Sequence, residues 1–217
     1  MRIFGWRALL LAILLSASGS RLPAAVIVDR VAAVIDQQVI TVSEITQMAE
    51  LRFFPRKAGQ DDDAYRRDIL DALIAQGLRS RDVERFGAPD VSKDSIEARL
   101  LEIQKRFASP AEFDAALARA ELTPDELRTL IKRQLQVEES IQERFAPLIF
   151  VSTDEIENDY RTTYSQERRQ RGLPIPPLNQ VTGDIRTLLR ADRLQTEVTN
   201  WTTQLRARAN VDIYAWK

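Results

Sequence analysis

Two apolar runs separated by a polar turn stand ahead of the first helical pattern of the chain. The runs are Val31-Ala-Ala-Val-Ile35 and Val39-Ile40, and Asp36-Gln-Gln38 lies between them. Both alternating sets of the first run are apolar, which is typical of a strand covered on each face. The turn lacks the glycine that tight hairpins favour. The pattern predicts a hairpin within residues 26–40, and Ser43 is the expected N-cap of a helix that follows.

Apolar positions at helical spacing fill most of the remaining chain, and polar caps mark where the helices begin. In Ser109-Pro-Ala-Glu112 and Thr123-Pro-Asp-Glu126, a hydroxyl stands at the N-cap, proline at the first helical position and glutamate at the third. One long helix is predicted over residues 181–209. Side chains that can accept hydrogen bonds from unpaired helical N–H groups predict the other starts, at Asp61, Asp62 and Asp63 together, and at Ser92, Ser109, Thr123 and Ser152.

Two further segments depart from the helical pattern. Residues 165–180 are polar, then basic, then rich in proline, and we expect an exposed loop or linker there. Its arginines Arg168, Arg169 and Arg171 could contact an anion or a partner, although a solvated loop face is favoured. Alternation over residues 211–215 predicts a strand. We expect that strand to share a small sheet with the hairpin, and the sequence leaves the pairing direction open.

The order of these elements resembles the SurA-type periplasmic chaperones. The resemblance is carried by the hairpin motif Val28-Asp-Arg-Val-Ala-Ala-Val-Ile35, by Ile69-Leu-Asp-Ala-Leu-Ile74 with Gly87, by Val151-Ser-Thr-Asp-Glu-Ile156, and by residues 196–213. It implies a mainly α fold, a helical chaperone core with a small β-sheet formed by an N-terminal hairpin and a C-terminal strand. It also implies a SurA N-terminal-like helical domain over residues 26–164. Residues 165–180 would then be a linker that replaces the parvulin-type isomerase domain of the family, and residues 181–217 would complete the core.

The beginning of the chain reads as a secretory signal peptide over residues 1–20. Arg2 and Arg7 make the first seven residues positively charged. Ala8–Leu15 is an uninterrupted apolar run, and small residues follow at 16–20. Cleavage is expected between residues 18 and 25. The run is too short for a permanent span of the ~30 Å hydrocarbon layer, with an uncleaved anchor as the alternative. The sequence therefore predicts a periplasmic protein with no permanent membrane span.

Composition narrows the chemistry further. The chain has no Cys and no His, which removes disulfides, thiol nucleophiles, Ser-His-Asp triads and the usual zinc ligand sets. Without Arg2 and Arg7, 29 basic groups stand against 32 acidic ones, a net charge of −3, and this gives no reason to expect nucleic acid as a partner. Carboxylate or Ser-Lys pairs remain possible, but solvated charge is the favoured interpretation. We assign no catalytic, metal or cofactor-binding residue and expect no cofactor.

The resemblance favours an ATP-independent chaperone that binds unfolded envelope or outer-membrane proteins and is not an enzyme. Two alternatives are an isomerase-family protein with residual foldase activity and an assembly or secretion partner dedicated to one client. The parvulin site of the family characteristically contains paired histidines, and residues 165–180 are too few for that domain. Aromatic side chains that could contact a client are Phe53, Phe54, Tyr160, Tyr164 and Trp216. Since aromatics at helical spacing more often lie in a core, client-binding residues stay unassigned.

Overall fold

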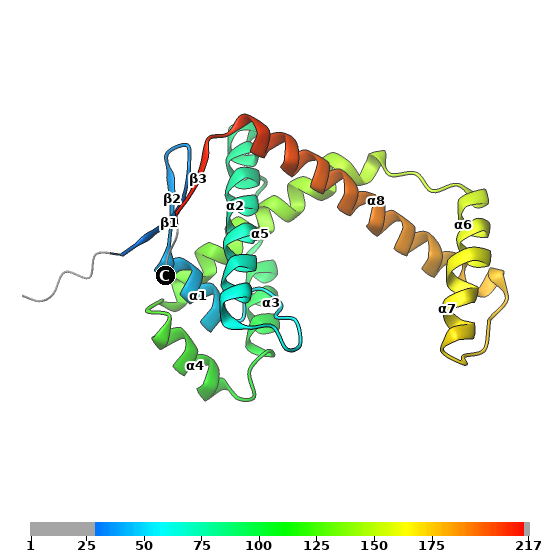
Figure 1. Cartoon of the computed structure of the whole chain (residues 1–217), viewed down its shortest axis with the longest axis horizontal. Coiled ribbons are helices and arrows are strands. Elements are labelled where there is room, and N and C mark those ends of the chain that lie inside the picture. The colour runs from blue at the N-terminus through cyan, green and yellow to red at the C-terminus, as the bar shows by residue number, and fades with distance from the viewer. Residues whose placement is uncertain (1–28, 215–217) are drawn as a thin grey trace, which may run out of the picture.

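A three-stranded antiparallel sheet joins the two ends of the chain that the computed structural model describes, residues 29–214 (Figure 1). The hairpin consists of β1 (Val31–Ile35) and β2 (Gln38–Thr41). β3 (Val211–Ile213) pairs antiparallel with β1, and Val34 stands opposite Asp212. The predicted hairpin and its pairing with the C-terminal strand are therefore confirmed. The predicted signal peptide lies outside the described residues.

The hairpin turn explains how a glycine-free sequence reverses direction. Asp36 has φ 53°, a left-handed conformation that Asp tolerates better than most residues. Its N–H donates to the Asn210 carbonyl at 2.8 Å, and its carboxylate accepts the Asn210 N–H at 2.8 Å. The turn that reverses the hairpin thus also fixes the start of β3.

Helices fill the rest of the described chain. They are α1 (Val42–Glu50), α2 (Asp62–Phe86), α3 (Lys93–Gln104), α4 (Pro110–Arg119), α5 (Pro124–Phe145), the 3-10 turn η1 (Ala146–Leu148), α6 (Thr153–Asp159), the π-helix η2 (Tyr160–Tyr164), α7 (Ser165–Gln170) and α8 (Leu178–Arg208). The predicted helix starts from residue 61 to Ser152 are confirmed, since a side chain at each start accepts a backbone N–H. Of the three aspartates at residues 61–63, Asp61 is the N-cap.

Ser43 was the wrong choice for the first cap. β2 runs directly into α1, so the last extended residue is Thr41, whose hydroxyl oxygen accepts the Glu44 N–H at 3.2 Å. Ser43 lies inside the first helical turn, and its N–H donates to the Asp29 carboxylate at 3.2 Å. The absence of a loop between strand and helix moved the cap two residues toward the N-terminus.

The segment expected to be a loop is helical over much of its length. Residues 153–170 form one continuous helical stretch through α6, η2 and α7, and α8 begins at residue 178, three residues before the predicted 181. Gln, Glu and Arg have good helix propensity, so a polar run need not be a loop. Only residues 171–177 are non-helical between α7 and α8.

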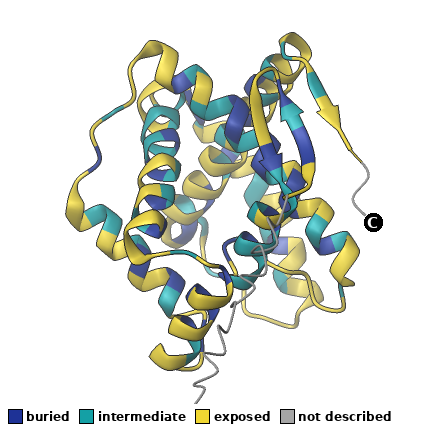
Figure 2. Cartoon of the chain, turned by 90° about the vertical axis from the view of Figure 1, so that its left-hand side faces the viewer, coloured by how far each residue is buried: buried dark blue, intermediate teal, exposed yellow. Residues whose placement is uncertain are grey.

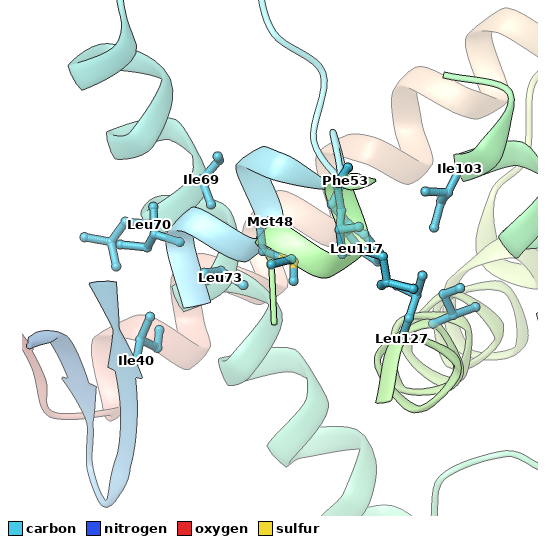
Figure 3. Packing of buried hydrophobic residues seen from close by; sticks show 14 of the residues in the cluster. Ile40, Met48, Phe53, Ile69, Leu70, Leu73, Ile103, Leu117 and Leu127 are labelled. Atoms are coloured by element: carbon cyan, nitrogen blue, oxygen red, sulfur yellow. The ribbon is translucent and has the colours of Figure 1, made fainter. Parts of the chain in front are cut away.

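The main core lies between the sheet and helices α1 to α5, whose outward faces are exposed (Figure 2) and whose buried side chains meet in the interior (Figure 3). Gly77 lets α2 approach β1, because a Cβ there would lie 3.0 Å from the Ile35 Cδ1. Side chains that lose almost all solvent contact form the centre of this core, among them Ile35, Ile40, Ile45, Ile69, Ile74, Ile103, Leu127 and Ile131. We refer to this part of the chain as the body.

Helices α6, η2 and α7, together with the N-terminal half of α8, form a separate arm beside the body (Figure 1). A small core of Val151, Ile156, Val181 and Ile185 holds the arm together. α8 then runs back to the body, where Trp201 packs with Val83 of α2 and Val137 of α5. Among residues 29–214, no helix has the length and apolar character needed to cross a membrane.

Candidate functional site

The structure separates the five aromatic residues that the sequence singled out. Phe53 lies in the body core with 7% of its surface exposed, whereas its neighbour Phe54 is half-buried and meets it edge-on, with ring centroids 5.9 Å apart. Tyr160 and Tyr164 are half-buried in the arm, their rings stacked at 5.8 Å. Trp216 lies outside the described residues. Phe54, Tyr160 and Tyr164 therefore remain candidates for contact with another polypeptide, and Phe53 belongs to the core.

Phe54 lines a cleft of about 590 Å³ beside the segment that joins α1 to α2. Its apolar lining comes from Ala49, Phe54, Pro55 and Tyr65, and its charged lining from Arg52, Arg56 and Arg106. We call this the aromatic–arginine cleft. A lining of aromatic rings and arginines suits an extended segment that carries aromatic side chains, because guanidinium groups and aromatic rings attract each other.

Hydrogen bonds hold the cleft in shape. The Tyr65 hydroxyl donates to the Phe54 carbonyl at 2.9 Å, and burial raises the pKa of this hydroxyl. Arg56 donates to Asp62 at 2.6 Å and lies 5.2 Å from the Tyr65 ring centroid. Arg106 donates to the Phe53 carbonyl at 2.9 Å. Since these groups are already paired within the chain, the cleft is preorganised and a ligand need not order it.

A second cavity, of about 210 Å³, is lined by residues of β2, α1, α2 and α5. Ile40, Met48 and Leu73 supply apolar lining, and Glu44 and Arg133 add charge. Burial raises the pKa of the Glu44 carboxyl, while the Thr41 backbone N–H and Arg133 act in the opposite direction. The cavity therefore combines an apolar wall with a carboxylate that is poorly solvated.

The sequence analysis did not identify the most exposed apolar side chains. Phe86, Leu148 and Phe150 each expose about three quarters of their surface, at 76%, 76% and 75%. Residues 148–151, which we call the connector, lead from α5 to α6: Leu148 ends the 3-10 turn η1, and no helix or strand follows until α6. Ile149 and Val151 are buried, whereas Leu148 and Phe150 are exposed. Alternation in an extended segment was the available signal, but alternation alone does not tell which set faces inward.

Two arginines of α8 hold the connector in place. Arg190 donates to the Ala146 carbonyl at 3.2 Å, and Arg193 donates to the Phe150 carbonyl and to the Glu155 carboxylate. Hydrogen bonds from the Ser152 backbone N–H, from the Ser152 hydroxyl and from Arg193 keep the pKa of Glu155 below its usual value. The backbone of the connector is thus fixed while the side chains of Leu148 and Phe150 stay exposed.

The arginines of the expected linker have different surroundings. Arg168 is half-buried, donates to the Pro174 carbonyl at 2.6 Å and lies 5.5 Å from the Tyr164 ring centroid. Arg169 and Arg171 are exposed, as a solvated face requires. Arg168 therefore contacts the chain itself. Within the part of the chain that the structure describes, no group of His, Cys, Asp or Glu side chains is placed to hold a metal ion.

No family model matches the chain. Two proteins named Chaperone SurA are similar to it in sequence. That of Pseudomonas putida strain KT2440 is 29% identical over 157 residues, which are 68% of this chain and 37% of that protein. That of Vibrio vulnificus strain YJ016 is 29% identical over 140 residues, which are 62% and 32% of the two chains. The chain spans about a third of the length of these relatives.

A solved structure gives the same indication for the fold. It comes from work on PEB4 and Cj1289, described as two structurally related SurA-like chaperones of Campylobacter jejuni, and the TM-score is 0.50 at 12% identity. The match covers 86% of this chain and all of the other. The helices, the small sheet and this likeness define a mainly helical fold like that of the solved structure. Together with the sequence relatives, they confirm the resemblance to SurA-type chaperones.

Proposed function

We propose that the protein is an ATP-independent periplasmic chaperone that binds unfolded envelope or outer-membrane proteins and does not catalyse prolyl isomerisation. The observation that carries the proposal is the sequence similarity to proteins named Chaperone SurA. The SurA-like fold supports it. The periplasmic location is supported by the leader pattern of residues 1–20.

The exposed side chains of the connector fit reversible binding of unfolded chains. Complete burial of a Leu or Phe side chain contributes about 1.5–3 kcal/mol, and Leu148 and Phe150 have most of their surface available. The client loses conformational freedom when it binds, which offsets part of this gain. Binding is therefore weak, and a client that folds elsewhere is removed from the binding equilibrium without a nucleotide cycle.

Light scattering of a diluted, denatured porin tests the proposal directly. At near-stoichiometric amounts and without ATP, the protein is expected to delay aggregation. No delay at a several-fold molar excess would contradict the chaperone function.

A matched pair of variants tests the connector. Leu148→Ser together with Phe150→Ser removes two exposed apolar side chains and leaves the buried set in place. We expect this double variant to bind the denatured porin at least about tenfold more weakly, which corresponds to about 1.4 kcal/mol. Leu101→Ser on α3, where Leu101 is 56% exposed, is the control and should behave as the unmodified protein. Equal loss in both variants would show that the connector has no special role.

A further inference from the structure

Residues 173–177, Leu-Pro-Ile-Pro-Pro, follow α7, and the chain here runs back beside the helical stretch that precedes them (Figure 1). We call these residues the proline segment. The Tyr160 hydroxyl donates to the Pro176 carbonyl at 2.8 Å, and Arg168 Nε donates to the Pro174 carbonyl at 2.6 Å. Two side chains of the arm therefore bind two alternate carbonyls of one short segment.

The sequence of the proline segment restricts its backbone. Each proline fixes its own φ near −65°, and the residue before a proline is held in the extended or polyproline II region. Pro177 has φ −56° and ψ 146°, which lies in that region. A polyproline II chain makes no hydrogen bonds within itself, so its carbonyls are available to outside donors. Tyr160 and Arg168 supply such donors.

The surface beside the proline segment contains two stacked aromatic rings. The Tyr160 and Tyr164 rings are 5.8 Å apart with only 19° between their planes, and the Arg168 guanidinium lies 5.5 Å from the Tyr164 ring centroid. Both tyrosines belong to the π-helix η2 and pack on the small core of the arm. Stacked rings with nearby donors are the chemistry by which proteins recognise proline-rich segments in the polyproline II conformation.

The proline segment is held at the surface and not within the core. Leu173 and Ile175 expose 45% and 37% of their surface, and Pro174 and Pro177 are also exposed. The arm core consists of Val151, Ile156, Val181 and Ile185, all outside this segment. Displacement of the segment would therefore uncover the tyrosines without removing a residue of that core.

From this geometry we propose that Tyr160, Tyr164 and Arg168 form a binding site for proline-rich polypeptide in the polyproline II conformation. Residues 173–177 are its resident ligand, and a proline-rich segment from another polypeptide can replace them. The proposal rests on the proposed function only in taking that polypeptide to be a client. A tethered ligand has an effective concentration in the millimolar range, so it competes strongly with any ligand added from solution.

Fluorescence anisotropy with a labelled peptide of residues 173–178 tests the site on the full chain. The double variant Pro174→Ala, Pro176→Ala frees the backbone of the resident ligand and should bind the peptide at least about tenfold more tightly than the unmodified protein. In this background, Tyr160→Phe keeps the ring and removes the donor, and it should weaken binding about tenfold. Arg168→Gln, which removes the Nε donor, should have a similar effect.

The matched control is Tyr214→Phe, because Tyr214 is about half exposed and lies beyond β3 on the body. It should leave the affinity unchanged, and a peptide with alanine in place of each proline should not bind. Circular dichroism checks that every variant is folded. If the freed variant binds no more tightly than the unmodified protein, or if Tyr160→Phe and Arg168→Gln have no effect, the proposal is wrong. Since this assay needs no client aggregation, its failure is distinct from failure of the light-scattering test.

Discussion

Glu44 carries its carboxyl at a partly buried position in the first turn of α1, beside the smaller cavity. Burial raises its pKa above the ordinary value of 4.5. An acid whose pKa is higher in the folded state destabilises the fold at a pH where it is ionised in both states. This destabilisation decreases as the pH falls through the raised pKa, and it is absent well below 4.5, where the group is protonated in both states.

We therefore expect Glu44→Gln to raise the free energy of unfolding at pH 7.5 and to make little difference at pH 3.5. Glutamine fills nearly the same volume without the charge. Urea unfolding at both pH values measures the effect, and Glu157→Gln on the exposed face of α6 is the control. A Glu44→Gln variant that is less stable at pH 7.5 would show that the hydrogen bond from the Thr41 backbone N–H and the attraction of Arg133 outweigh burial.

Neighbouring residues also show where sequence analysis stops at this scale. Phe53 and Phe54 are adjacent and chemically identical, yet one lies in the core and the other lines the aromatic–arginine cleft. They follow the end of α1, where no helical or strand periodicity assigns a face. The distinction comes from tertiary contacts, such as the hydrogen bond of Arg106 to the Phe53 carbonyl.

At the scale of the element, helix starts were the most predictable feature of the chain. A cap is a local interaction between a side chain and a backbone N–H two or three residues away, so the sequence contains both partners. The prediction of Ser43 as a cap is wrong because strand pairing, a non-local interaction, determines where α1 begins. The loop prediction for residues 165–170 is wrong for a different reason. Their polarity suggests a loop, but their helix propensity favours the helix that they form.

The cap of α5 provides a quantitative test. The Thr123 hydroxyl oxygen accepts the Glu126 N–H at 3.3 Å, and the Glu126 carboxylate accepts the Thr123 N–H at 2.7 Å. We expect Thr123→Ala to lower the free energy of unfolding by about 1 kcal/mol, because one helical N–H loses its partner. Thr129→Ala, in the same helix beyond its first turn, is the control and should be neutral or slightly stabilising. Equal losses in thermal or urea unfolding would contradict the role of the cap.

At the scale of the whole molecule, α8 connects the arm to the body. Near its C-terminal end, Trp201 Nε1 donates to the Asp82 carboxylate at 3.2 Å, and Arg144 of α5 donates to the same carboxylate at 3.1 Å. Three helices thus meet at one side chain, and β3 follows directly to join the sheet. The sequence predicted that the C-terminal strand returns to the hairpin. The separation of arm and body could not be predicted. The sequence does not show which apolar residues of the connector are buried and which are exposed.

The same organisation leads to the last prediction, which concerns catalysis. Prolyl isomerisation has a barrier of about 18–20 kcal/mol, and lowering it requires a preorganised pocket around the twisting bond. The parvulin-type domain would lie between α7 and α8, where the chain has only residues 171–177, and the sequence contains no histidine for its paired-histidine site. A protease-coupled assay on an Ala-Pro peptide should therefore show the uncatalysed rate, with a time constant of tens to hundreds of seconds at 25 °C, at every protein concentration. The proposed tyrosine site would bind a proline-rich chain in its ground state. Binding of the ground state alone does not accelerate rotation about the prolyl bond. Acceleration that scales with added protein and persists after repurification would show that the protein itself catalyses isomerisation, and Tyr160→Phe would then test whether the site in the arm is responsible.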